Sequence, residues 1–118
     1  MIRVLVADHL PIISYGIRML FENSTDIKIV NTANSAKQLL DYLKKSNADI
    51  VLMTMDLPDI NGITMLRTIK KEFNDVRVII FSIHPEDIYA VSAIKAGASG
   101  YLSKTVTTAT IKRAILKV

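Results

Sequence analysis

The sequence predicts a single α/β domain in which five parallel strands alternate with five helices. The chain has 118 residues, the usual size of one domain. Short apolar runs recur along it between polar residues, as in strands that are buried on both faces of a sheet. Between these runs the apolar residues take the spacing of an amphipathic helix.

The first half of the chain contains three of the strands. Strands are predicted near residues 2–7, 27–33 and 49–54, around short runs rich in β-branched apolar side chains. Pro11 follows the first run where the first turn of a helix would begin, and that turn tolerates proline because its N–H groups have no partner in the helix. Apolar side chains at residues 36–43 follow the i, i+3, i+4, i+7 spacing and predict the next helix.

The second half of the chain repeats the alternation. The Asn61-Gly62 turn leads into a helical stripe at residues 66–73. Pro85 marks the start of a further helix and Gly97 its end. The remaining strands and helical stripes are expected at residues 76–81, 90–94, 99–102 and 111–118.

Strands that alternate with helices imply a parallel sheet with right-handed crossovers and helices on both faces. Five short strands fit the flavodoxin-like, doubly wound (βα)5 sandwich with the strand order 2-1-3-4-5. The methionines Met19, Met53, Met55 and Met65 are expected to fill its core.

Composition excludes several classes of protein. Half of the residues are hydrophobic and 22% are charged, which excludes a disordered chain. The absence of cysteine excludes a disulfide scaffold, a thiolate nucleophile and a cysteine zinc site. Neither a signal peptide nor an apolar run near the roughly 18 residues of a membrane span is found. We therefore expect a cytoplasmic protein that does not contact a membrane.

The net charge of +4 raises the question of nucleic-acid binding. The excess lies in residues 61–118, which hold nine Lys/Arg against four Asp/Glu. These basic residues are spaced out without aromatic residues between them, which favours solvated helix faces over a DNA-binding stripe.

The residues that follow the predicted strands mark the place where chemistry is expected, because ligands bind beyond the carboxyl ends of parallel strands. Such a rim would combine carboxylates, hydroxyls and a lysine, which suit an anion such as phosphate. The residues concerned are Asp8, His9, Thr54, Asp56, Ser82 and Lys104.

At these positions the sequence resembles the receiver domain of bacterial response regulators, in particular those that precede a LuxR/NarL-type helix-turn-helix. The stretch Ala-Gly-Ala-Ser-Gly-Tyr-Leu-Ser-Lys at 96–104 is the most specific match, and the resemblance covers essentially the whole chain. The other matching residues are 2–8, Pro11, Gly16, 49–53, 57–58, 61–62 and 78–82.

The resemblance implies phosphoryl transfer from a histidine kinase to one aspartate, with Mg²⁺ held by acidic residues. Position by position, it makes Asp8 the first acidic residue and Ser82 the switch hydroxyl. It makes Lys104 the phosphate-contacting lysine and Tyr101 the switch aromatic.

Two positions depart from the family pattern. His9 stands where the second acidic residue is expected, and Thr54 stands where the acceptor aspartate is expected. A threonine hydroxyl is a weak nucleophile without a base, and Mg²⁺ prefers carboxylate ligands. We therefore expect a pocket without catalytic residues, with Mg²⁺ lost or held weakly by Asp8 and Asp56. Ile83 would further crowd a phosphodonor.

Other readings of the same residues stay open. Asp56 or Thr54 could still accept a phosphoryl group, or Thr54 could be the target of a Ser/Thr kinase. A transition-metal site at His9 and His84 is less expected, because the two lie far apart without ligand spacing. Flavin binding is rejected, since no phosphate-binding loop follows the first strand.

We expect residues 1–118 to be the receiver of a transcriptional regulator, a non-enzymatic signalling module. Its DNA-binding helix-turn-helix would lie beyond Val118, so DNA would be bound there and not by this domain. A homodimer is expected, through the fourth helix, fifth strand and fifth helix or through the first and fifth helices. A sensor histidine kinase or an adaptor protein would be its further partner.

Overall fold

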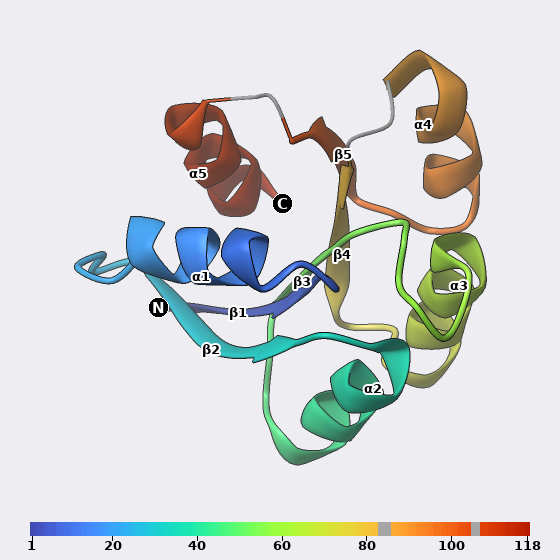
Figure 1. Cartoon of the computed structure of the whole chain (residues 1–118), viewed down its shortest axis with the longest axis horizontal. Coiled ribbons are helices and arrows are strands. Elements are labelled where there is room, and N and C mark those ends of the chain that lie inside the picture. Colours follow the sequence, from blue (N-terminus) through green and yellow to red (C-terminus); the bar gives the residue numbers. More distant parts are fainter. Residues whose placement is uncertain (83–85, 105–106) are drawn as a thin grey trace.

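Five parallel strands form one sheet in the order β2-β1-β3-β4-β5 (Figure 1). The computed structural model describes residues 1–82, 86–104 and 107–118, with residues 86–89 as backbone alone. The strands are β1 (Ile2–Ala7), β2 (Ile27–Ala33), β3 (Ile50–Met53), β4 (Arg77–Ser82) and β5 (Gly100–Ser103). This order confirms the predicted doubly wound fold, and the predicted strand boundaries agree to within one residue.

Helices cover both faces of the sheet (Figure 1). They are α1 (Pro11–Leu20), α2 (Ala36–Lys45), α3 (Gly62–Glu72), α4 (Glu86–Lys95) and α5 (Thr108–Lys117). α1 and α5 pack on one face, and α2, α3 and α4 pack on the other. Among the described helices, none is long and apolar enough to cross a membrane.

The helices begin and end where the sequence places their signals. Pro11 is the first residue of α1, as predicted. Asn61 caps α3, since its side-chain oxygen accepts a hydrogen bond of 2.8 Å from the N–H of Ile63. Gly97 follows α4 with a φ of +112°, the left-handed conformation that favours glycine at a helix end. Pro85 lies outside the described residues.

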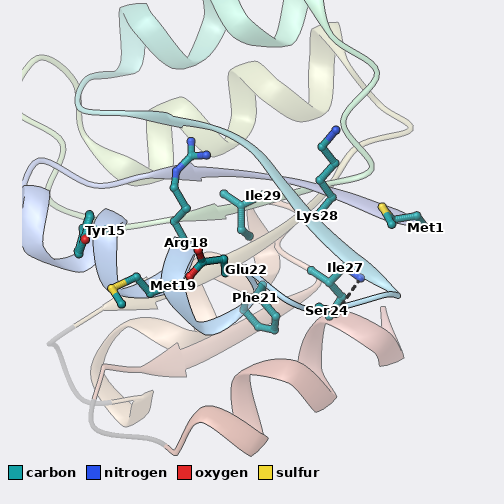
Figure 2. A pocket seen from close by; sticks show the side chains of 10 residues that line it. All are labelled: Met1, Tyr15, Arg18, Met19, Phe21, Glu22, Ser24, Ile27, Lys28 and Ile29. Atoms are coloured by element: carbon teal, nitrogen blue, oxygen red, sulfur yellow. Dashed lines mark hydrogen bonds between the residues drawn. The ribbon is translucent and has the colours of Figure 1, made fainter.

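The loop between α1 and β2 is held by Ser24. Its Oγ accepts hydrogen bonds from the N–H groups of Asp26 (3.3 Å) and Ile27 (3.2 Å), the second of which is drawn in Figure 2. The bond to Ile27 fixes the first residue of β2, the edge strand of the described sheet.

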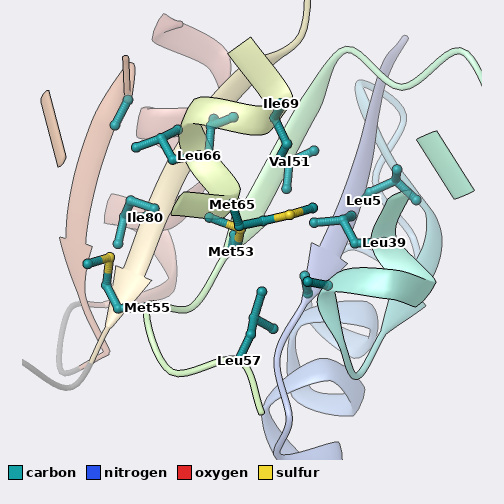
Figure 3. Packing of buried hydrophobic residues seen from close by; sticks show 14 of the residues in the cluster. Leu5, Leu39, Val51, Met53, Met55, Leu57, Met65, Leu66, Ile69 and Ile80 are labelled. Atoms are coloured by element: carbon teal, nitrogen blue, oxygen red, sulfur yellow. The ribbon is translucent and has the colours of Figure 1, made fainter. Parts of the chain in front are cut away.

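The core has one layer on each side of the sheet, because the central strands are buried on both faces. Met53 of β3 and Met65 of α3 meet in the larger layer and are fully buried (Figure 3). Met55 is buried there too, so three of the four methionines that were predicted to fill the core do so. Met19 was predicted wrongly: it is 54% exposed. It lies two residues from the buried Ile17, about 200° around the helix and therefore on the opposite side.

Gly62 fixes the loop between β3 and α3 against the start of α3. Its N–H donates to the carbonyl oxygen of Met55 at 3.2 Å. A Cβ atom at this position would lie 2.7 Å from the Cα of Met55 and 2.8 Å from its carbonyl oxygen. Backbone atoms cannot give way as a flexible side chain can, so the close approach requires glycine.

We predict that Gly62→Ala lowers the free energy of unfolding by about 1–3 kcal/mol, because the added methyl group overpacks the loop. Gly16→Ala is the matched control, since a Cβ there meets nothing within 4 Å. That variant should be neutral or stabilising by up to about 1 kcal/mol through its higher helix propensity. Urea unfolding of both variants measures the difference, and equal effects would contradict the close approach at Gly62.

Candidate functional site

The candidate site lies at the carboxyl ends of the strands, where backbone hydrogen bonds between neighbouring strands continue just beyond β1, β3 and β5. The N–H of Asp8 donates to Ala33 at 3.0 Å, and the N–H of Thr54 donates to Ala7 at 3.0 Å. The N–H of Lys104 likewise donates to the carbonyl oxygen of Ser82 at 2.8 Å. These bonds involve residues at the carboxyl ends of all five described strands, which lie at one rim as the parallel fold predicts.

A buried ion pair occupies the centre of this rim. Lys104 Nζ lies 2.7 Å from Asp8 Oδ2, and the two side chains are only 8% and 3% exposed. Asp8 Oδ1 accepts a second hydrogen bond of 2.9 Å from the N–H of Leu10. Both carboxylate oxygens therefore have a donor, as a buried charge requires.

Thr54 lies beside this ion pair and is 1% exposed. Its Oγ1 accepts from the N–H of Asp56 at 3.3 Å and is 3.5 Å from Lys104 Nζ, the limit of a hydrogen bond. The ammonium of Lys104 also lies 6.0 Å from the centre of the Phe81 ring. The rim thus joins Asp8, Lys104 and Thr54 in one network.

His9 lies at the edge of the network. Its side chain is 39% exposed, and its Nδ1 is 3.6 Å from Asp8 Oδ1, too long for a good hydrogen bond. His84 and Ile83 lie outside the described residues. In the part of the chain that the structure covers, no three His, Asp or Glu side chains gather closely enough to hold a metal ion.

The remaining predicted site residues differ in burial. Asp56 is exposed in the loop after Thr54 and meets the network through its backbone. Ser82 is fully buried at the end of β4. Tyr101 is 6% exposed and belongs to the core layer under α2, α3 and α4. Tyr101, which the resemblance predicts to be the switch aromatic, is therefore buried in this structure.

Asp59 is a positioning residue that the sequence analysis missed. Its Oδ1 accepts from the N–H of Ala36 at 2.8 Å, and its Oδ2 accepts from the N–H of Lys37 at 3.0 Å. These bonds tie the β3–α3 loop to the start of α2 and lower the pKa of the Asp59 carboxyl, because they favour its ionised form. No local signal reveals them, since the partners lie 22 and 23 residues away in the chain.

Comparison with known proteins decides the family. The response regulator receiver domain family matches residues 4–116. The chain belongs to this family. The resemblance stated from the sequence is thereby confirmed for the domain as a whole.

The relatives of this receiver domain include response regulators of known sequence and structure. Response regulator UvrY of Escherichia coli (strain K12) is 35% identical over 104 residues, which cover 88% of this chain and 48% of UvrY. The Fimbriae Z protein of the same strain is 36% identical over 101 residues, covering 86% of this chain and 48% of that protein. The chain thus spans about half the length of these curated relatives.

A solved structure supports the same assignment. The crystal structure of a two-component response regulator of the LuxR family from Aurantimonas sp. SI85-9A1 superposes with a TM-score of 0.90 and 32% identity. The superposition covers 98% of this receiver domain and 82% of that chain.

We predict that Lys104→Met lowers the free energy of unfolding of the receiver domain by about 3 kcal/mol, because it leaves the buried Asp8 carboxylate without its cation. Adding Asp8→Asn should recover part of this loss, since the unpaired charge is then removed. Urea unfolding of the two single variants and the double variant gives the coupling energy. If the stability changes of the two single variants simply add up in the double variant, the ion pair would be contradicted.

Asp59→Ala should cost about 1 kcal/mol of stability at neutral pH, the usual effect of losing a capping carboxylate. Because the folded pKa of Asp59 lies below its usual value of 3.8, its contribution is present above pH ~4 and is lost as the pH falls through the folded pKa. Urea unfolding between pH 7 and pH 3 should therefore show the two proteins converging toward low pH. Asp41→Asn, which removes an exposed carboxyl on α2, is the control. A stability difference between wild type and Asp59→Ala that stays constant with pH would contradict the role given to Asp59.

Proposed function

We propose that this receiver domain is a signalling and dimerisation module that is not phosphorylated on aspartate. The observation that supports the proposal is the buried contact of 2.7 Å between Lys104 Nζ and Asp8 Oδ2. In the family pattern a metal ion and an acceptor carboxylate would surround these two side chains. Here the lysine neutralises the one carboxylate directly, and Thr54 beside it is uncharged.

The residues at the rim do not fit Mg²⁺ well. The ion requires octahedral oxygen ligands, usually with one or two carboxylates among them. Both oxygens of Asp8 already accept hydrogen bonds, from Lys104 and from the N–H of Leu10. His9 offers an imidazole nitrogen in place of a carboxylate oxygen, and Thr54 offers a neutral hydroxyl. Mg²⁺ would have to displace the ammonium of Lys104 to reach Asp8.

The same residues disfavour phosphoryl transfer. To attack phosphorus, the Thr54 hydroxyl must lose its proton to a base. Its nearby partner Lys104 is an ammonium, which cannot accept that proton. Asp56 carries a carboxylate, but it lies in the exposed loop and contacts Thr54 through its backbone N–H. The domain therefore has no catalytic residue in this proposal.

The output would be transcriptional. The curated relatives are about twice as long as this chain, and one structural relative is a LuxR-family regulator. Both facts support a C-terminal helix-turn-helix that binds DNA in place of the receiver itself. A homodimer and an interaction with a sensor histidine kinase or adaptor protein belong to the same proposal.

The test is incubation with acetyl phosphate and Mg²⁺, followed by intact mass measurement. We predict that the wild-type domain gains no phosphoryl group, whereas the double variant His9→Asp/Thr54→Asp gains one, because it has the two missing carboxylates. A thermal unfolding curve confirms that the double variant is folded.

The opposite results are informative as well. A phosphoryl group on the wild-type domain that is lost in Asp56→Asn or Thr54→Val would overturn the proposal and identify the acceptor. A folded double variant that gains no phosphoryl group would show that His9 and Thr54 do not account for the loss of phosphorylation.

A further inference from the structure

A groove runs between the outer side of α1 and the edge strand β2 (Figure 2). We call it the α1–β2 groove. Its volume is about 680 Å³, which is large enough for several side chains of a ligand. The groove lies on the side of α1 that Met19 occupies, where the sequence analysis wrongly expected core.

The walls of the α1–β2 groove combine exposed apolar side chains with polar and charged ones. Tyr15 and Met19 of α1 are 65% and 54% exposed, and Met1 also lines the groove. Tyrosine, methionine and arginine are the residue types enriched in protein interfaces. Flexible methionine side chains adapt to the shape of a partner. These side chains form an apolar surface that the domain itself does not cover.

The charges around the α1–β2 groove are mainly positive. Arg18 of α1 and Lys28 of β2 both line it, and Figure 2 shows their side chains extending to the same side of the groove. Among the described residues that line the groove, Glu22 is the one acidic side chain. The exposed cations would attract an anionic partner, and apolar contacts would hold it.

The α1–β2 groove continues along the molecule. A second hollow of about 350 Å³ shares Tyr15 and Arg18 with it and extends to Asp8. The two hollows together form an open surface from the sheet edge to the rim of the strands. An elongated ligand, such as a peptide segment, matches this shape better than a compact small molecule.

We infer that the α1–β2 groove is the docking surface for a segment of a partner protein that carries acidic side chains next to apolar ones. The apolar side chains would enter between Tyr15 and Met19, and the acidic ones would meet Arg18 and Lys28. This inference goes beyond the proposed function. It would hold whether or not the domain accepts a phosphoryl group.

The test uses synthetic peptides of equal length that alternate apolar residues with either Glu or Lys. The Glu–apolar peptide is added to ¹⁵N-labelled domain, and amide shifts are followed by NMR. We expect saturable shifts confined to α1 and β2, with a Kd below about 1 mM. Arg18→Glu/Lys28→Glu should weaken binding by about tenfold or more and should bind the Lys–apolar peptide instead.

The control variant is Arg67→Glu/Lys71→Glu on α3, which changes the same charges at exposed positions outside the groove. It should leave the affinity for the Glu–apolar peptide close to that of the wild type. Equal weakening in both double variants would overturn the inference, because it would indicate attraction to net charge alone. So would shifts on other elements, absence of binding, or self-association that buries the groove against a second copy.

A second variant tests the apolar part of the surface. Tyr15→Ala/Met19→Ala removes two exposed side chains and should leave the domain folded, with weaker peptide binding and unchanged thermal unfolding. Unchanged peptide affinity in this variant would overturn the placement of the apolar side chains.

Discussion

The buried ion pair between Lys104 and Asp8 is the interaction on which the character of this receiver domain depends. Two charges have been taken out of water at the rim of a parallel sheet, and their contact of 2.7 Å compensates that cost. The carboxylate has a further donor in the N–H of Leu10, so its charge is fully matched within the protein. On the proposed function, such a pocket would not need a metal ion to relieve repulsion among acidic groups.

The surrounding structure supports this arrangement from several directions. The ladder bonds at Asp8, Thr54 and Lys104 hold their backbones in register at the ends of neighbouring strands. The loop after Thr54 is held at one end by the close approach of Gly62 to Met55. The carboxylate of Asp59 holds the same loop to the start of α2. The inward position of Tyr101 is compatible with a domain that keeps one conformation.

Local sequence patterns predicted the fold because apolar residues recur with different spacing in buried strands and in amphipathic helices. The parallel topology then predicted which residues lie together at the rim. Asp8, Thr54, Ser82 and Lys104 could be named in this way. The contacts among these residues could not be predicted, because a distance such as that from Lys104 to Asp8 depends on the packing of the whole sheet. The role of Asp59 was hidden for the same reason. The exposure of Met19 could not be predicted from its residue type, because it depends on which side of α1 faces the sheet.

On the proposed function the net charge of +4 is explained in part, since His9 and Thr54 would stand at two positions that the family pattern makes acidic. The most direct test of the central claim is a Mg²⁺ titration of the ¹⁵N-labelled domain, followed by NMR at the amides of Asp8, Thr54 and Lys104. The account predicts no saturable shift of these amides at physiological Mg²⁺ concentrations. Saturable shifts at all three would contradict it, because they would show that the metal displaces Lys104 from Asp8.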